Sequence, residues 1–229
     1  MTKPHSLIIA IDGPSGAGKS TVGRMLARDL KLLYLDTGAM YRAVALAVIE
    51  AGVNLTDEAA IVEIARRVDI HLEGDPDSLQ VRLDGRDIST RIRDEQVTHA
   101  SSVISTIPGV RREMVRRQRE MGARGGVVLD GRDISTVVFP GADIKFFLTA
   151  VPEERARRRY EEERVKSIDT NYEETLADIN ARDRRDSTRA DSPLAIAEDA
   201  VVIDSTELSL EEVYERMLSV VGEKTNRQD

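Results

Sequence analysis

Short apolar runs alternate with longer helical segments along most of the chain. The runs at residues 7–11, 32–35, 126–129, 144–148 and 201–204 are continuous or nearly continuous in apolar residues. Strands buried on both faces of a sheet have such runs, whereas half-exposed strands alternate apolar and polar residues. Because these runs alternate with helices, we predict an α/β fold built on a doubly wound parallel sheet of five strands.

Helical periodicity connects these strands, and capping residues mark several of the helix starts. The predicted helices cover residues 19–30, 38–51, 56–68, 94–105, 109–122, 152–166, 170–186 and 209–221. Thr56 is placed to cap the third of them. Thr170 with Glu173, and Ser209 with Glu212, have the spacing of capping boxes for the last two.

One segment has a different period. Residues 69–73 and 79–83 alternate apolar and polar positions, and turn sequences follow each of them. This pattern predicts half-exposed antiparallel strands, so we expect a small antiparallel insert at about residues 69–92 of a single domain. The other predicted parts are a core at residues 6–68, 93–151 and 187–222 and a helical lid at about residues 152–186.

The composition narrows the class of protein. Hydrophobic residues make up 41% of the 229 and aromatic residues only 3%, which predicts an aliphatic core. A net charge of -8 argues against nucleic-acid binding, which needs a basic surface. The chain has no cysteine, and its longest purely apolar run, residues 43–49, is too short to span a bilayer. We expect a cytoplasmic monomer that binds neither nucleic acid nor membrane.

A glycine-rich turn follows the first strand. The octapeptide Gly13–Ser20 fits the pattern G-x-x-x-x-G-K-[ST], which is called a P-loop, between a buried strand and a helix. In such a loop backbone N–H groups surround phosphate oxygens, Lys19 reaches the β- and γ-phosphates, and the Ser20 hydroxyl holds Mg²⁺. The residues predicted to bind ATP are Gly13, Pro14, Ser15, Gly16, Ala17, Gly18, Lys19, Ser20 and Thr21. The alternatives are a turn that binds nothing and a switch GTPase, but the guanine-reading Asn-Lys-x-Asp is absent from the sequence.

Charged residues follow two further strands, at the edge of the sheet where ligands of such folds bind. This rule directs attention to Asp12, Asp36 and Asp130. The segment 36–42 has two equally good interpretations. It is either an anion site at a helix N-terminus, or a helix cap followed by side chains that cover the core. The segment 127–133 resembles a Walker B element, with a salt-bridged turn as the alternative.

The octapeptide Leu-Asp-Gly-Arg-Asp-Ile-Ser-Thr occurs twice, at residues 83–90 and 129–136. The flanking sequences differ, so the chain is not a domain repeat. The first copy follows an alternating strand and is predicted to be a hairpin turn with Arg86 and Asp87 as turn residues. The second copy follows a buried strand, so we assign function to Arg132 and Asp133.

Together these segments closely resemble the bacterial-type cytidylate kinases. The matching pieces are residues 11–21, 36–42, 130–140 and 182–186, in the order of that family over nearly the whole chain. The resemblance implies a kinase that uses Mg²⁺ and transfers the γ-phosphoryl group of ATP to CMP, and to dCMP, by direct in-line transfer. Ser135 departs from the family pattern, which has glycine there.

The resemblance also implies residue roles. The monophosphate site would consist of Thr37, Tyr41, Arg42, Ser102, Arg111, Asp130, Arg132, Asp133, Arg182 and Asp186. Catalytic residues would be Lys19, Arg132, Arg158, Arg182 and Arg189. Ser20 would bind Mg²⁺ directly and Asp36 through water.

Arginines are concentrated in the predicted lid, on the helices around residues 155–159 and 182–189. A charged helical hairpin that closes over two nucleotides would offset phosphate charge and exclude water. The alternative is a solvated face, because glutamates interleave these arginines at pairing distance. The rival functions are a P-loop kinase for UMP or shikimate, a non-enzymatic nucleotide-binding switch, and an ATPase that binds DNA or RNA.

Overall fold

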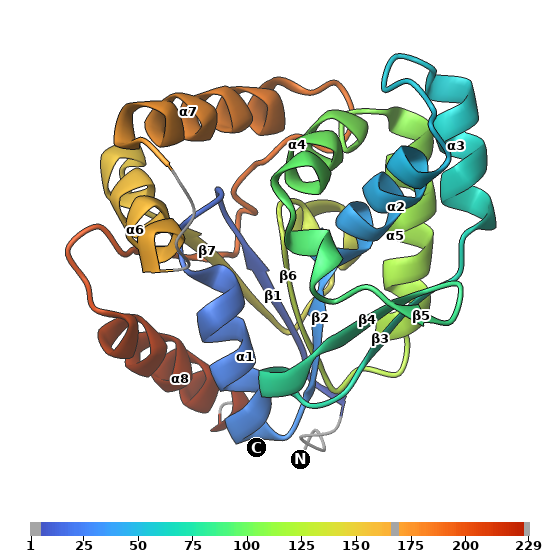
Figure 1. Ribbon diagram of the computed structural model, residues 1–229. Coiled ribbons are helices and arrows are strands. Elements are labelled where there is room, and N and C mark those ends of the chain that lie inside the picture. The colour runs from blue at the N-terminus through green and yellow to red at the C-terminus, as the bar shows by residue number, and fades with distance from the viewer. Residues whose placement is uncertain (1–5, 166–169, 227–229) are drawn as a thin grey trace.

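A five-stranded parallel sheet forms the centre of the molecule, as predicted (Figure 1). The computed structural model describes residues 6–165 and 170–226. The strand order is β2-β6-β1-β7-β8. The strands are β1 (Ile8–Asp12), β2 (Leu33–Asp36), β6 (Val127–Gly131), β7 (Ile144–Thr149) and β8 (Val201–Asp204). All four pairings are parallel, so the carboxyl ends of the strands meet at one edge.

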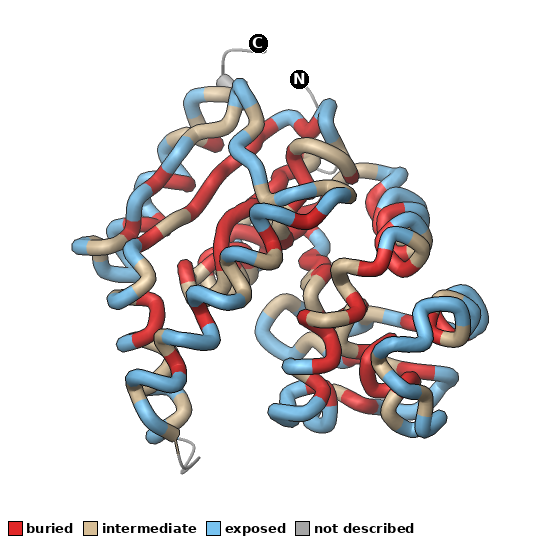
Figure 2. Tube along the Cα trace, turned by 90° about the horizontal axis from the view of Figure 1, so that it is seen from above, coloured by how far each residue is buried: buried red, intermediate tan, exposed pale blue. Residues whose placement is uncertain are grey.

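Helices cover both faces of the sheet, which explains why its strands are apolar on both sides. Alternate residues of β1 take part in different cores. Ile9 and Ile11 pack with α1 and α8, whereas Ala10 belongs to the cluster on the opposite face, with Val115 of α5. The helices are α1 (Lys19–Leu30), α2 (Thr37–Glu50), α3 (Glu58–Arg67), α4 (Glu95–Ile104), α5 (Pro108–Gly122), α6 (Pro152–Val165), α7 (Tyr172–Thr188) and α8 (Leu210–Asn226). Figure 2 shows the buried residues along the strands and on the inner faces of these helices.

The segment after α3 forms a separate antiparallel sheet of three strands, in the order β3-β4-β5. Its strands are β3 (Ile70–Glu73), β4 (Gln80–Leu83) and β5 (Arg86–Asp87), with short 3₁₀ turns at η2 (Pro76–Ser78) and η3 (Arg91–Arg93). The inward residues of β4 join a second apolar cluster with α2, α3 and α4. This sheet therefore packs on the helices of one face and does not extend the central sheet.

Two of the predicted helix caps are wrong, and in each case a residue next to the predicted one caps the helix. Asp57 caps α3 through the N–H of Ala60 at 3.0 Å, while the Thr56 hydroxyl donates to Asn54. Asn171 caps α7 in place of Thr170. Carboxylate and amide oxygens cap at least as well as a threonine hydroxyl, so either neighbour could have been chosen on propensity.

The predicted capping box of the last helix is confirmed. The Ser209 N–H and hydroxyl both donate to Glu212, and the Glu212 N–H donates back to the Ser209 hydroxyl at 3.2 Å.

In the described ranges, no helix is long and apolar enough to cross a membrane.

Candidate active site

The glycine-rich loop between β1 and α1 curls tightly around the start of the helix. Gly13, Gly16 and Gly18 have φ angles of 146°, 79° and 90°. Lys19 is the first residue of α1, and its buried Nζ donates to the Pro14 carbonyl at 2.6 Å. The lysine is thus folded back over the loop that is predicted to surround the phosphates of ATP.

The first glycine of this loop is expected to be the least replaceable. A Cβ at Gly13 would lie 1.9 Å from the Leu148 carbonyl oxygen, whereas one at Gly18 would have its nearest neighbour 4.0 Å away. Both positions would strain an L-residue, but only Gly13→Ala adds a backbone clash. We expect Gly13→Ala to lower the free energy of unfolding by about 3 kcal/mol or more, and Gly18→Ala by about 1–2 kcal/mol. Urea denaturation of both variants would measure this, and equal losses would contradict it.

Asp130, near the end of β6, lies against the P-loop. Its two carboxylate oxygens accept hydrogen bonds from the Ser20 hydroxyl and from the Tyr34 hydroxyl, each at 2.7 Å. Burial raises the pKa of Asp130 most, and the neighbouring Asp36, its partner in the strand register, raises it further. Tyr34 was not predicted as a site residue, and the only signal for it is an aromatic residue in an otherwise aliphatic run.

Ser20 and Asp130 fit a magnesium site. A hydroxyl and a buried carboxylate in contact are the hard oxygen ligands that Mg²⁺ prefers. Among the described residues there is no group of three or more His, Asp or Glu side chains that could hold a metal ion. Asp36, predicted to act through water, caps α2 through the Ala39 N–H and pairs with Arg42 at 2.9 Å.

Two further residues at these strand ends, Asp12 and Thr37, form hydrogen bonds that stabilise the surrounding backbone. Asp12, expected from the strand-end rule to take part in the chemistry, accepts hydrogen bonds from the N–H groups of Ile134 and Ser135 and from the Ser135 hydroxyl. It therefore anchors the turn η4 (Ile134–Val138), a single π-helical turn that follows Arg132 and Asp133. The hydroxyl of Thr37 donates to the Asp130 carbonyl, while the Asp36 carboxylate caps α2.

Three cations converge beside the P-loop. Burial lowers the pKa of Lys19 well below its ordinary value, and Arg132 and Arg182 lower it further. Burial, and then Arg132, lower the pKa of Arg182 to about 9. The Arg182 Nε is buried and has no hydrogen-bond partner among the described residues. Like charges held together in this way favour the binding of an anion, because the anion offsets their repulsion.

Ion pairs extend this cluster toward α2 and α5. Arg132 pairs with Asp186 at 2.9 Å, and Arg111 pairs with Asp133. The Arg111 guanidinium also lies 5.7 Å from the centre of the Tyr41 ring, and burial raises the pKa of that tyrosine to about 12. Arg189 lies 3.9 Å from Asp133 and 3.6 Å from Asp186. Residues from α2, α5, β6 and α7 are thus brought together at one edge of the sheet.

Two of the predicted site residues have other contacts. Ser102, on α4, accepts hydrogen bonds from Arg185 of α7 at 3.0 and 3.2 Å. Arg158 donates to the Ser205 carbonyl and hydroxyl just beyond β8, and to Glu154 on its own helix. Arg158 therefore lies on the β8 side of the P-loop, away from the Asp133–Arg111 pair.

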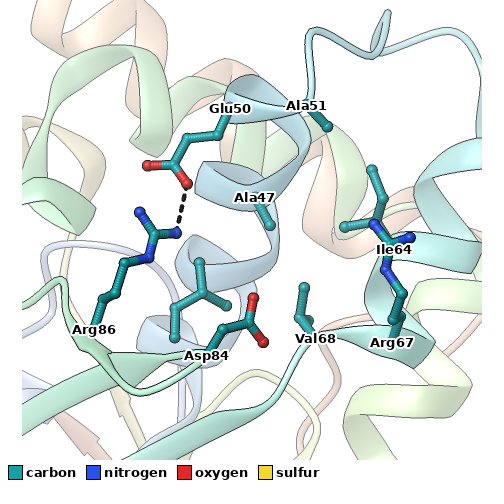
Figure 3. Close-up of a pocket in the computed structure, with 9 residues that line it drawn as sticks. Ala47, Glu50, Ala51, Ile64, Arg67, Val68, Asp84 and Arg86 are labelled. Atoms are coloured by element: carbon teal, nitrogen blue, oxygen red, sulfur yellow. Dashed lines mark hydrogen bonds and ion pairs between the residues drawn. The ribbon is translucent and has the colours of Figure 1, made fainter.

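The two copies of the repeated octapeptide lie in different environments. The first forms a hairpin with positive φ at Asp84 and Gly85, as predicted, but Arg86 and Asp87, predicted to be turn residues, form the short strand β5 and pair with β4. Arg86 pairs there with Glu50, the last residue of α2, at 2.7 Å. Figure 3 shows these two side chains in a cavity of about 350 Å³ between α2, α3 and the turn. Since Thr37 begins α2 and Glu50 ends it, this cavity lies at the opposite end of α2 from the cation cluster.

The whole chain resembles proteins of one family. The family model for cytidylate kinase matches residues 9–223. The cytidylate kinase of Caldanaerobacter subterraneus subsp. tengcongensis is 52% identical over 217 residues, which cover 95% of each chain. That of Bacillus subtilis is 47% identical over 219 residues, 96% of this chain and 98% of its own. A shikimate kinase structure from Bacteroides thetaiotaomicron aligns over 94% of this chain and 98% of its own, with 13% identity and a TM-score of 0.49. With a family model and close relatives that cover nearly its whole length, the chain belongs to the cytidylate kinase family.

Proposed function

We propose that the protein transfers the γ-phosphoryl group of ATP to the phosphate of CMP. The observation that carries the proposal is the proximity of the P-loop lysine to Arg132, which follows β6 and pairs with Asp186 of α7 at 2.9 Å, and to Arg182, one turn before Asp186 on α7. Three cations from three elements match the charge that develops when two phosphates approach each other. Membership of the family supplies the acceptor, because the relatives named above are cytidylate kinases.

On the ATP side, backbone N–H groups of residues 13–21 other than Pro14, which has none, bind the phosphates, and Lys19 neutralises their charge. Ser20 and Asp130 hold Mg²⁺, which when bound neutralises charge on the β- and γ-phosphates. Arg158 lies near the carboxyl end of β8, one helical turn after Arg155, whose side chain touches the P-loop. We assign Arg158 to the nucleoside end of ATP on this ground.

On the acceptor side, Arg42, Arg132 and Arg182 hold the phosphate of CMP. Arg42 and Arg182 each have a buried Nε without a partner in the described ranges, so both retain a donor for a phosphate oxygen. The base and sugar contact the residues around Tyr41 and the Asp133–Arg111 pair. Ser102, Asp186 and Arg189 complete this side of the site.

Transfer is direct and in line. The acceptor is already an anionic phosphate oxygen, so no strong general base is needed. Lys19, Arg132 and Arg182 offset the charge on the moving group, while α6 and α7 exclude water that would otherwise hydrolyse ATP. We further propose that dCMP is accepted and that the protein acts as a cytoplasmic monomer without nucleic-acid or membrane partners.

A coupled assay of ADP release from ATP and Mg²⁺ tests the function. Acceptors are CMP, dCMP, UMP, AMP, GMP, TMP, shikimate and none. We expect fast turnover with CMP and dCMP and little with the rest. Comparable turnover with UMP would widen the substrate, while turnover with shikimate alone would overturn the assignment. Tight ATP binding without acceptor-dependent turnover would identify a binding protein instead.

A further inference from the structure

One arginine of the lid is buried against the P-loop. The Arg155 side chain is 3% exposed, although α6 is otherwise largely polar. Its Nε donates to the Ala150 carbonyl at 2.8 Å, and its Nη1 donates to the Ser15 carbonyl in the P-loop at 3.0 Å. A Cβ at Gly16 would lie 3.1 Å from the Arg155 Cβ, so this glycine lets α6 approach the loop. The lid is therefore in direct contact with the loop that binds ATP.

The same guanidinium also holds α7. Arg155 donates to both carboxylate oxygens of Asp183, from Nη1 at 3.2 Å and from Nη2 at 2.6 Å. All three of its nitrogens thus contact protein acceptors, which leaves it poorly suited to bind a phosphate. A bidentate pair of this kind, with the guanidinium buried and the carboxylate partly exposed, fixes orientation as well as distance. Arg155 consequently joins the P-loop, the end of β7 and α7 through one side chain.

Asp183 is adjacent in sequence to Arg182. Unlike Arg155, Arg182 is surrounded by other cations and has an unpaired nitrogen within the part of the chain that the structure describes. Arg182 is repelled by Arg132, Arg42 and Arg159, and its Nε lacks a partner among the described residues. Ion pairs on either side of it hold α7 in place, since Asp183 pairs with Arg155 and Asp186 pairs with Arg132. The attraction at these two points opposes the repulsion that would move Arg182 away from the site.

We propose that Arg155 and Asp183 are positioning residues that hold Arg182 over the P-loop. The inference rests on the proposed function, in which Arg182 touches the phosphates. Because Arg155 also contacts Ser15, the position of Arg182 depends on the conformation of the P-loop. The catalytic geometry of the lid is then set by a contact to the ATP site and not by the acceptor alone.

The test measures whether the effect of Asp183→Asn on kcat depends on the presence of Arg182. Asp183→Asn keeps size and shape but removes the charge that Arg155 pairs with. We expect kcat to fall by a factor of about 10 to 100, as for small misplacements of a catalytic group, with smaller changes in KM for ATP and CMP. In an Arg182→Gln background, the same substitution is expected to cause no further fall in kcat. Asp183→Glu, which keeps the carboxylate, is expected to recover part of the loss.

Controls separate a positioning role from a structural one. Arg157→Gln removes a surface ion pair with Glu154 and Glu161 from the same helix and is expected to leave kcat unchanged. Arg155→Lys keeps the charge without the fork, and its loss of kcat should likewise vanish in the Arg182→Gln background. An equal loss in both backgrounds would overturn the positioning role alone. Full activity of Arg182→Gln itself would overturn the role of Arg182 and the inference with it.

Discussion

Replacement of Lys19 by alanine is expected to lower kcat on the order of a thousandfold, which is typical of groups that clamp transferring phosphates. The reason lies in its position. Lys19 is buried at the first turn of α1, its Nζ is fixed by the Pro14 carbonyl, and Asp130 and Asp12 attract it. Arg132 and Arg182, the two cations that lower its pKa, approach from other elements, so we expect neither to take its place. Steady-state assays with CMP at saturating ATP and Mg²⁺ would measure the loss.

Lys145 offers a matched control for removal of a buried lysine. It lies near the amino end of β7, at the edge of the sheet opposite the site, and its Nζ donates to Asp199 at 2.8 Å. Lys145→Met is expected to change stability but not kcat, because Asp199 is largely exposed and can be hydrated when its partner is lost. A Lys19→Ala enzyme with near-wild-type kcat, or an equal loss of kcat in Lys145→Met, would contradict the assignment.

The central sheet was predictable because its inner strands β1, β6 and β7 are buried on both faces. Continuous apolar runs such as 7–11 cannot be exposed, and their alternation with helices leaves few arrangements. The strand order was not predicted, and it has consequences for the site. Only the placement of β6 between β1 and β2 brings Asp130 beside Ser20, a contact between residues 110 positions apart in the sequence.

Helix caps were predicted less well than helices. Thr56 and Asp57 are both good capping residues, and the choice between them depends on whether the preceding loop uses the hydroxyl elsewhere. The Thr56 hydroxyl bonds to Asn54, so Asp57 caps. The capping box at Ser209 was correct, but the same spacing at Thr170 and Glu173 was misleading, because the neighbouring Asn171 caps that helix.

The sequence did not predict which arginines of α6 and α7 are buried. The interpretation as a solvated helix face is correct for Arg157 and Arg159, since each pairs with a glutamate one turn away. It fails for Arg155, which has the same glutamate-rich neighbourhood in the sequence but is buried against the P-loop. Burial of an arginine is decided by what packs on it, and the P-loop is 140 residues away in the chain. Residues that act through others, such as Arg155, carry no motif of their own.

Arg132→Gln is expected to lower kcat on the order of a thousandfold, the low end of what a charge-stabilising arginine contributes in GTPases. The repeated octapeptide supplies the control, because Arg86 has the same seven neighbours within it. Arg132 lies at the end of a buried strand, repels Lys19 and Arg182, and is held by Asp186. Arg86 lies in the short exposed strand β5 with Glu50 as its partner.

The comparison of Arg132→Gln with Arg86→Gln asks whether position or local sequence determines function. If position determines it, Arg86→Gln keeps wild-type kcat and KM for CMP, because the cavity beside it lies at the far end of α2 from the P-loop. The Glu50 contact is shared with Arg91, so its loss should change the fold little. A large loss of kcat in Arg86→Gln would mean that the antiparallel insert transmits an effect to the site through α2. Retained activity in Arg132→Gln would remove one of the three cations on which the proposed transfer depends, and Lys19 and Arg182 would then have to hold both phosphates without it.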